Sequence, residues 1–138
     1  MKLLMIYCNS FAYTPAIKNL EEAEEVTKSA RFENAQVAFI QVEAEDELEG
    51  REKSIEEKLL NFTKWVARKN DTRKIVLHSF AHLSESKASA EFTKALFDRV
   101  EVRLKNVDYE VAQTPFGYFL DLEVNAPGFS LARVFKSF

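Results

Sequence analysis

The chain has 138 residues, a hydrophobic content of 46% and a net charge of −3. A chain of this length fits one domain that can bury roughly two-thirds of its unfolded surface, so it needs no disulfide or structural metal. Its single cysteine, Cys8, excludes an intramolecular disulfide and a four-cysteine zinc site. The acidic balance argues against a protein that holds nucleic acid through its own basic field, but it is compatible with a domain that handles one nucleotide end.

The start of the chain is predicted to form two strands. Leu3 to Ile6 is too short to span a bilayer and lacks a signal-peptide cleavage pattern, so we expect a cytoplasmic protein with no membrane partner. Lys2 to Cys8 is a continuous apolar run bounded by Asn9-Ser10, which is typical of a buried strand followed by a turn. Phe11 to Ile17 is expected to return antiparallel to it, at an edge position because it contains a proline.

A loop and a central strand follow. Leu20 to Phe32 is acidic and poorly periodic, which predicts a loop or a short helix. Gln36 to Val42 is rich in β-branched and aromatic residues and predicts a central strand. Glu45 to Gly50 is then a charged, solvated connection.

An amphipathic helix is predicted next. Ser54 and Glu57 can form a capping box at its start, or the charged residues before them can extend the helix backwards. Asn70-Asp71 ends it, and Lys74 to Ser79 is the next strand. The helix is indicated by apolar residues that share one face: Ile55, Leu59, Phe62 and Val66.

The last part of the chain predicts one more helix and three strands. Val107 to Ala112 and Leu120 to Val124 alternate apolar and acidic residues, as strands with one wet face do, and a turn at Pro127-Gly128 leads to a last strand from Leu131 to Phe135. The pattern as a whole predicts an α/β domain with a mixed, largely antiparallel sheet packed with two main helices. The second helix is marked by Ala88, Phe92, Leu96, Val100 and Leu104.

Two stretches at predicted strand ends are the candidate ligand-binding segments. Pro115 to Phe119 and Phe80 to Ser84 each place a small residue, Gly117 or Ala81, beside aromatic residues. A ligand could approach the backbone closely at such positions. The chain contains no phosphate-binding glycine loop, dinucleotide-binding fingerprint, zincin helix or nucleophile elbow.

Other candidate groups have simpler explanations. A nucleophilic pair between Cys8 and a histidine is conceivable, but a lone cysteine is more often a small buried residue, and His78 inside a strand is more often structural. A metal site is not expected. The only basic cluster is either a solvated helix face and turn or a contact with an RNA backbone, and it consists of Lys64, Arg68, Lys69, Arg73 and Lys74.

Three motifs carry a resemblance to a known family. Ala-Phe-Ile-Gln-Val-Glu at 38–43, Phe-Ala-His-Leu-Ser at 80–84 and Pro-Phe-Gly-Tyr at 115–118 resemble the archaeal N-terminal editing domain of threonyl-tRNA synthetase. That domain shares its fold with D-aminoacyl-tRNA deacylases. The resemblance runs through nearly the whole chain and implies that residues 1–138 are a single editing-type domain, the N-terminal part of a longer synthetase.

The resemblance also implies an activity and its partners. The reaction would be the hydrolysis of serine mischarged on threonine tRNA, with the terminal ribose 2′-hydroxyl helping to activate water and with no cofactor. The partners would be the 3′-terminal adenosine of the tRNA with its serine, the synthetase core, and a second copy in a homodimer. A threonine site cannot strongly reject serine, because one missing methyl is worth only about 1 to 3 kcal/mol, which explains the need for such a reaction.

Site residues follow from the same resemblance, position by position. The adenine side would be lined by Gln41, Val42 and Glu43, the aminoacyl pocket by Phe80, Ala81 and His82, and the facing wall by Pro115, Phe116 and Gly117, with Phe119 and Leu120 just beyond it. Main-chain groups would hold much of the substrate, which suits a chain with few acid and base side chains.

The sequence departs from the family at three of these positions. Phe119 and Leu120 stand where the family usually has a Tyr and a Lys, and Arg133 stands where it usually has a Glu. If Leu120 and Arg133 face each other on neighbouring strands, Arg133 supplies the missing cation, so that His82 and Arg133 are the catalytic candidates. The alternative is that Arg133 is a surface residue and Leu120 packs in the core.

Two other functions are compatible with the same fold. Phe119 and Leu120 favour a non-catalytic appended module that assists tRNA docking. A D-aminoacyl-tRNA deacylase would act on D-aminoacyl esters and spare L-serine.

Overall fold

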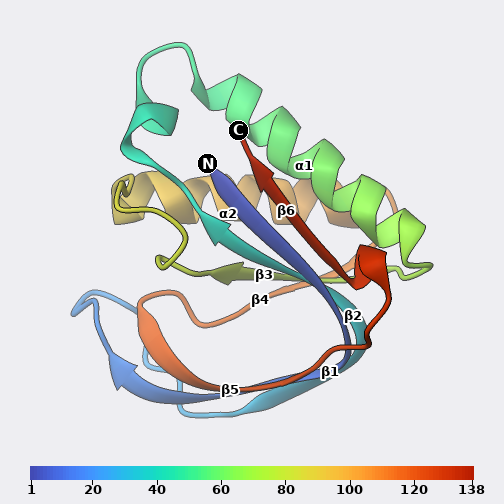
Figure 1. Cartoon of the computed structure of the whole chain (residues 1–138). Coiled ribbons are helices and arrows are strands. Elements are labelled where there is room, and N and C mark those ends of the chain that lie inside the picture. The colour runs from blue at the N-terminus through green and yellow to red at the C-terminus, as the bar shows by residue number, and fades with distance from the viewer.

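The sheet is built around one long strand, β1. A computed structural model describes residues 1–138, with the strand order β4-β3-β2-β1-β5 and with β6 also paired to β1 (Figure 1). β1 is antiparallel to β2, β5 and β6, whereas β3 is parallel to β2 and β4. The predicted fold class is therefore confirmed. The strands are β1 (Lys2–Lys18), β2 (Ala30–Gln41), β3 (Lys74–Ser79), β4 (Glu110–Gln113), β5 (Tyr118–Asn125) and β6 (Arg133–Ser137).

β1 continues through Asn9-Ser10, so the predicted turn between two antiparallel strands is wrong. The ladder with β2 is interrupted at Asn9, opposite Asn34, whose φ is 52°. Asparagine tolerates this left-handed conformation, and a local break in pairing bends a strand without reversing it. Two different strands therefore share one edge of β1: β6 pairs with its first part and β5 with its second.

The predicted edge character of the second part of β1 is consistent with its pairing. Beyond Tyr13, β1 pairs with β5 alone, and the register shifts between Pro15 and Ile17. Proline has no backbone N–H to donate, so it fits a stretch with a free side and a bulge.

Two helices cover one face of the sheet (Figure 1). α1 (Glu52–Lys69) begins after Arg51, so the predicted capping box at Ser54 is wrong and the charged residues before it extend the helix. α2 (Ala90–Lys105) begins after Ser89, whose hydroxyl accepts a hydrogen bond from the backbone N–H of Phe92 at 3.2 Å. Neither helix is both long and apolar enough to cross a membrane.

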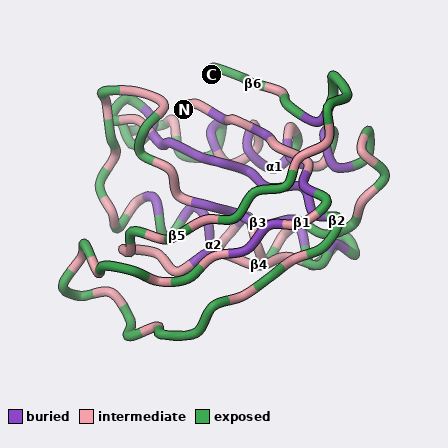
Figure 2. The backbone as a smooth tube through the Cα atoms, turned by 60° about the horizontal axis from the view of Figure 1, so that its bottom comes forward, coloured by how far each residue is buried: buried purple, intermediate pink, exposed green.

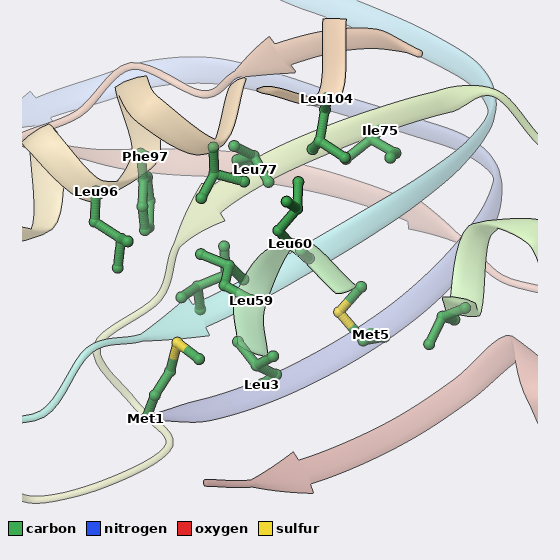
Figure 3. Close-up of a cluster of buried hydrophobic side chains, with 14 of the residues drawn as sticks. Met1, Leu3, Met5, Leu59, Leu60, Ile75, Leu77, Leu96, Phe97 and Leu104 are labelled. Carbon is green, nitrogen blue, oxygen red and sulfur yellow. The ribbon is translucent and has the colours of Figure 1, made fainter. Parts of the chain in front are cut away.

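The main core lies between this helical layer and the sheet. Strand residues such as Met5 and Leu77 meet helix residues such as Leu59 and Phe97 (Figure 3). A smaller core on the opposite face of the sheet contains Phe11 and Phe39. Figure 2 shows the buried residues concentrated in the central strands and the inner sides of the helices.

Three connections are long: residues 19–29, residues 42–51 and residues 80–89. Residues 19–29 form a loop without a helix, and β2 begins at Ala30, earlier than predicted. Residues 80–89 link β3 to α2. Short 3-10 turns at Ala44–Glu47 and Ser130–Ala132 interrupt the remaining loops.

Candidate functional site

The carboxyl ends of the three parallel strands β2, β3 and β4 meet at one edge of the sheet. The segments that follow them line a cleft of about 420 Å³. Ligands of α/β sheets commonly bind outside the carboxyl ends of parallel strands, where the loops diverge. The volume lies within the range of small-ligand sites. This cleft is the candidate functional site.

Nearly all residues expected to contact substrate line the cleft, and only Glu43 and Arg133 do not. Lys87 and Asn19 also line it, although no sequence motif marked either residue. The cleft thus brings together three motifs that lie far apart in the chain. The expected residues found in the lining are Gln41, Val42, Phe80, Ala81, His82, Pro115, Phe116, Gly117, Phe119 and Leu120.

The Gln41 side chain fixes the loop that carries His82. Gln41 is 3% exposed, and its amide oxygen accepts hydrogen bonds from the backbone N–H groups of Leu83 (2.6 Å) and Ser84 (2.7 Å). Its amide nitrogen donates to the carbonyls of Ser84 (2.7 Å) and Ser86 (2.8 Å). Because every polar group of this amide is paired, its role is to hold the loop against the end of β2.

Glu43 supports the same loop from outside the cleft. Its carboxylate accepts a hydrogen bond from the Ser84 hydroxyl at 2.6 Å, from the Met1 amine at 2.7 Å and from Lys2 Nζ at 2.9 Å. Burial by itself raises the pKa of Glu43, but the hydrogen bonds from the amine, Ser84 and Lys2 outweigh it and lower the pKa to about 2. Glu43 is therefore an ionised anchor, whereas the sequence placed it on the adenine side of the pocket.

His78 forms the floor of the cleft. It is 5% exposed, its Nδ1 lies 2.8 Å from the Thr114 hydroxyl, and its ring meets Phe39 edge to face with centroids 5.0 Å apart. Burial, together with the nearby His82, lowers the pKa of His78 to about 4. A neutral, hydrogen-bonded imidazole in an aromatic setting is a structural element here, as its position inside a strand predicted.

His82 is the exposed imidazole of the cleft. Its ring packs on Phe80 with centroids 4.9 Å apart. The backbone N–H groups of Ala81, His82 and Phe116 form no hydrogen bond within the protein. The cleft therefore offers main-chain donors beside one exposed imidazole, and no carboxylate is among its lining residues.

Position 117 requires a glycine because a loop packs against it. Its φ is +84°, and its carbonyl accepts hydrogen bonds from the backbone N–H groups of Asn19 (2.8 Å) and Leu20 (3.2 Å). A Cβ at this position would lie 2.8 Å from the Cβ of Ala23. The sequence explained this glycine by close ligand approach, but protein packing already requires it.

Tyr118 secures the same loop further along. Its hydroxyl donates to the Glu24 carbonyl at 2.8 Å and accepts from the Val26 N–H at 3.0 Å. Because Asn19 and Leu20 line the cleft, this loop forms one of its walls. Phe116 packs edge to face on Phe97 of α2.

The structure contradicts the premise that Arg133 faces Leu120. Leu120 pairs with Pro15 and Arg133 with Ile6, nine residues apart on β1. That separation is about 30 Å of extended strand. The Arg133 guanidinium donates to the Pro127 carbonyl at 2.9 Å and does not line the cleft. The cation in the lining is Lys87.

Cys8 takes no part in a nucleophilic pair. It is fully buried, its thiol lies 3.7 Å from the Ile6 carbonyl, and burial raises its pKa to about 11. A thiol in such a setting stays protonated and acts as a core residue. No three His, Cys, Asp or Glu side chains are grouped closely enough to hold a metal ion.

The mixed sheet with two helices on one face is a D-aminoacyl-tRNA deacylase-like fold. The structure of the c-Myc DNA Unwinding Element Binding Protein matches with a TM-score of 0.71, over 99% of this chain and 98% of that chain. The sequences are 10% identical, so this similarity is one of fold alone.

The family follows from the sequence comparison. Residues 1–138 match the model of the archaea-specific editing domain of threonyl-tRNA synthetase, and the chain belongs to this family. It is 31% identical to a threonine–tRNA ligase of Pyrococcus furiosus and 30% identical to that of Nitrosopumilus maritimus, each over 99% of this chain. The chain spans about a fifth of the length of these curated relatives, 22% and 21% respectively.

Proposed function

We propose that this domain hydrolyses serine esterified to threonine tRNA, as the N-terminal editing part of a longer threonyl-tRNA synthetase. The observation that carries the proposal is the cleft itself, which combines unpaired main-chain donors with a single exposed imidazole and has no carboxylate in its lining. Such a site suits a reaction in which the substrate supplies part of the proton transfer. Family membership supports the same reaction class.

The substrate is proposed to lie across the carboxyl ends of the three strands. The terminal adenosine rests beside the backbone of Gln41 and Val42, and the seryl group enters between Phe80 and Phe116. His82, exposed at the mouth of the cleft, is in the right place to contact the ribose or the ester. Lys87 contributes the positive charge that the sequence had assigned to Arg133.

In the proposed reaction a water molecule adds to the ester carbonyl carbon. The N–H groups of Ala81 and His82 donate to the oxyanion that forms, as backbone donors do in other acyl-transfer sites. The bond from that carbon to the ribose 3′-oxygen then breaks, and serine leaves as a free amino acid. The 2′-hydroxyl of the terminal ribose orients the water and passes its proton toward the 3′-oxygen, so no strong protein base is required.

Selectivity is proposed to reside in the size of the aminoacyl pocket. A pocket that accepts serine must reject one extra methyl, and it does so by steric overlap, which can discriminate more strongly than the loss of a favourable contact. A side chain can change its rotamer to make room for a larger ligand, whereas main-chain groups cannot. A pocket wall formed by main-chain groups therefore keeps its size.

Two features support a non-catalytic docking module as the second candidate. Phe119 is 53% exposed at the edge of the cleft, and Leu120 lines the cleft where the family resemblance calls for an ammonium group. An apolar rim would still bind an unpaired nucleotide by stacking. The third candidate, a D-aminoacyl-tRNA deacylase, shares the fold but requires the opposite stereochemistry.

One assay separates the three candidates. The domain is incubated with threonine tRNA charged with L-serine, with L-threonine and with a D-amino acid, and ester loss is followed over time. The proposed function predicts rapid loss of L-serine alone. Background-level loss of all three esters supports the docking module, and preferential loss of the D-amino acid supports the deacylase.

A homodimer is proposed as the working assembly. It is supported by two exposed apolar side chains, Ile17 of β1 and Phe119 of β5, which are register partners. Light scattering of the purified domain gives the test, because a mass of about one chain at micromolar concentration would contradict the dimer.

A further inference from the structure

A positively charged surface lies at the end of β3 opposite the cleft. It comprises Lys64, Arg68, Lys69, Arg73 and Lys74, and we call it the basic surface. None of these five cations forms an ion pair with an acidic side chain. By contrast, Arg99 and Arg103 on α2 are each held by glutamates of α1. Unpaired cations clustered on a chain of net charge −3 remain available for an outside anion.

The basic surface contains a preformed hollow. A cavity of about 440 Å³ is lined by Lys64, Arg68, Arg73 and Thr72, together with Val107 and Tyr109, and Asp71 is its one acidic residue. The Arg73 guanidinium lies 5.0 Å from the centre of the Tyr109 ring and donates to the Val107 carbonyl at 3.3 Å. Arg73 is therefore oriented before any ligand arrives.

An exposed aromatic side chain accompanies these cations. Trp65 is 40% exposed on the same end of α1, and Lys69 Nζ lies 5.9 Å from the centre of its ring. Trp65 lines a separate hollow with Lys58 and Phe138, so the cations and their cavity, and not this ring, define the basic surface.

We propose that the basic surface binds the phosphodiester backbone of the tRNA whose 3′ end occupies the cleft. The identity of this partner rests on the proposed function. The β3 strand separates the two sites by six residues, which is about 20 Å. A stacked strand rises about 3.4 Å per nucleotide, so the contacted phosphates lie roughly six nucleotides from the terminal adenosine, at the start of the acceptor stem.

The test compares two charge-removing double variants on one helix. Lys64→Gln/Arg68→Gln removes two cations of the basic surface, and Lys53→Gln/Lys58→Gln removes two from the other end of α1, where neither forms an ion pair. Binding of uncharged threonine tRNA is measured by fluorescence anisotropy between 50 and 200 mM salt. Serine release is measured on intact charged tRNA and on seryl-adenosine.

The expected result is specific to the first variant. Lys64→Gln/Arg68→Gln binds tRNA at least about tenfold more weakly at low salt, and the slope of log K against log salt becomes about 2 less steep. Release from seryl-adenosine is unchanged in both variants, because this substrate does not reach the basic surface. The Lys53→Gln/Lys58→Gln variant binds as the parent does.

Contrary outcomes identify which proposal fails. Equal binding by both double variants, or no measurable tRNA binding by the parent at 50 mM salt, overturns the proposal that the basic surface binds the tRNA backbone. If the two double variants differ in tRNA binding but no substrate loses serine, the proposal of tRNA binding by the basic surface is kept and the proposed editing reaction is rejected.

Discussion

The Gln41 amide is the polar group on which the shape of the cleft depends most. Gln41→Met keeps the length of the side chain but removes four hydrogen bonds to the loop between β3 and α2. At about 1 kcal/mol each, these bonds contribute roughly 4 kcal/mol. That is a large part of the 5 to 15 kcal/mol that stabilises an ordinary domain, so we expect the loop to detach locally while the sheet stays folded.

Hydrogen exchange read by mass spectrometry measures this directly. Peptides covering residues 80–89 should lose protection in Gln41→Met, and serine release should fall at least tenfold because Ala81 and His82 lose their positions. Gln36→Met is the matched control, since Gln36 is also buried on β2 but lies nearer the middle of the strand and accepts one hydrogen bond, from Asn70. Unchanged protection and activity in Gln41→Met would refute the role assigned to this amide.

Three further predictions concern single residues. Gly117→Ala places a Cβ on a backbone with a φ of +84° and against Ala23, which should cost about 2 kcal/mol and lower Tm by about 7 °C. Gly128→Ala, which has open space around it, should leave Tm unchanged, and equal Tm values for the two variants would contradict the packing argument. The unfolded chain binds a proton at His78 below pH 6.5, whereas the folded chain binds it only below about pH 4, so lowering the pH through this window should remove about 3 kcal/mol of stability. The free energy of unfolding, measured with urea at pH 7 and pH 4.5, should therefore change less in His78→Asn than in the parent. Lys87→Gln should lower kcat for serine release about tenfold, because it removes the positive charge in the cleft, whereas Lys136→Gln should leave kcat unchanged. Equal kcat values in the two variants would show that Lys87 has no role in the reaction.

The fold could be predicted largely from local patterns. The predicted strand at Lys74 to Ser79 agrees with β3, because burial on both faces of a strand gives a short continuous apolar run. The helix through Leu96 and Leu104 agrees with α2, because burial on one face of a helix repeats every three to four residues. The predicted turn at Asn9-Ser10 is wrong because polar residues in a sequence are compatible with a bend as well as with a turn. Only the partner strand, with Asn34 at positive φ, distinguishes the two.

The site residues were predicted from sequence motifs. The predictions that are wrong concern side chains whose direction depends on tertiary structure. Phe80, Ala81 and Phe116 could be placed because each follows a strand that ends at the same edge. Arg133 could not be placed, because the pairing of β5 and β6 with separate parts of one strand has no local sequence signature. The role of Gln41 is likewise visible only once the loop that it holds has been located.

The relative rate of serine and threonine release is the decisive measurement for the editing proposal. The domain in excess over charged threonine tRNA should release L-serine at least a hundredfold faster than L-threonine, and replacement of the terminal 2′-hydroxyl by hydrogen should abolish the serine reaction. Equal release of the two amino acids would contradict the proposed pocket. Full activity on the 2′-deoxy substrate would contradict the proposed role of the tRNA hydroxyl.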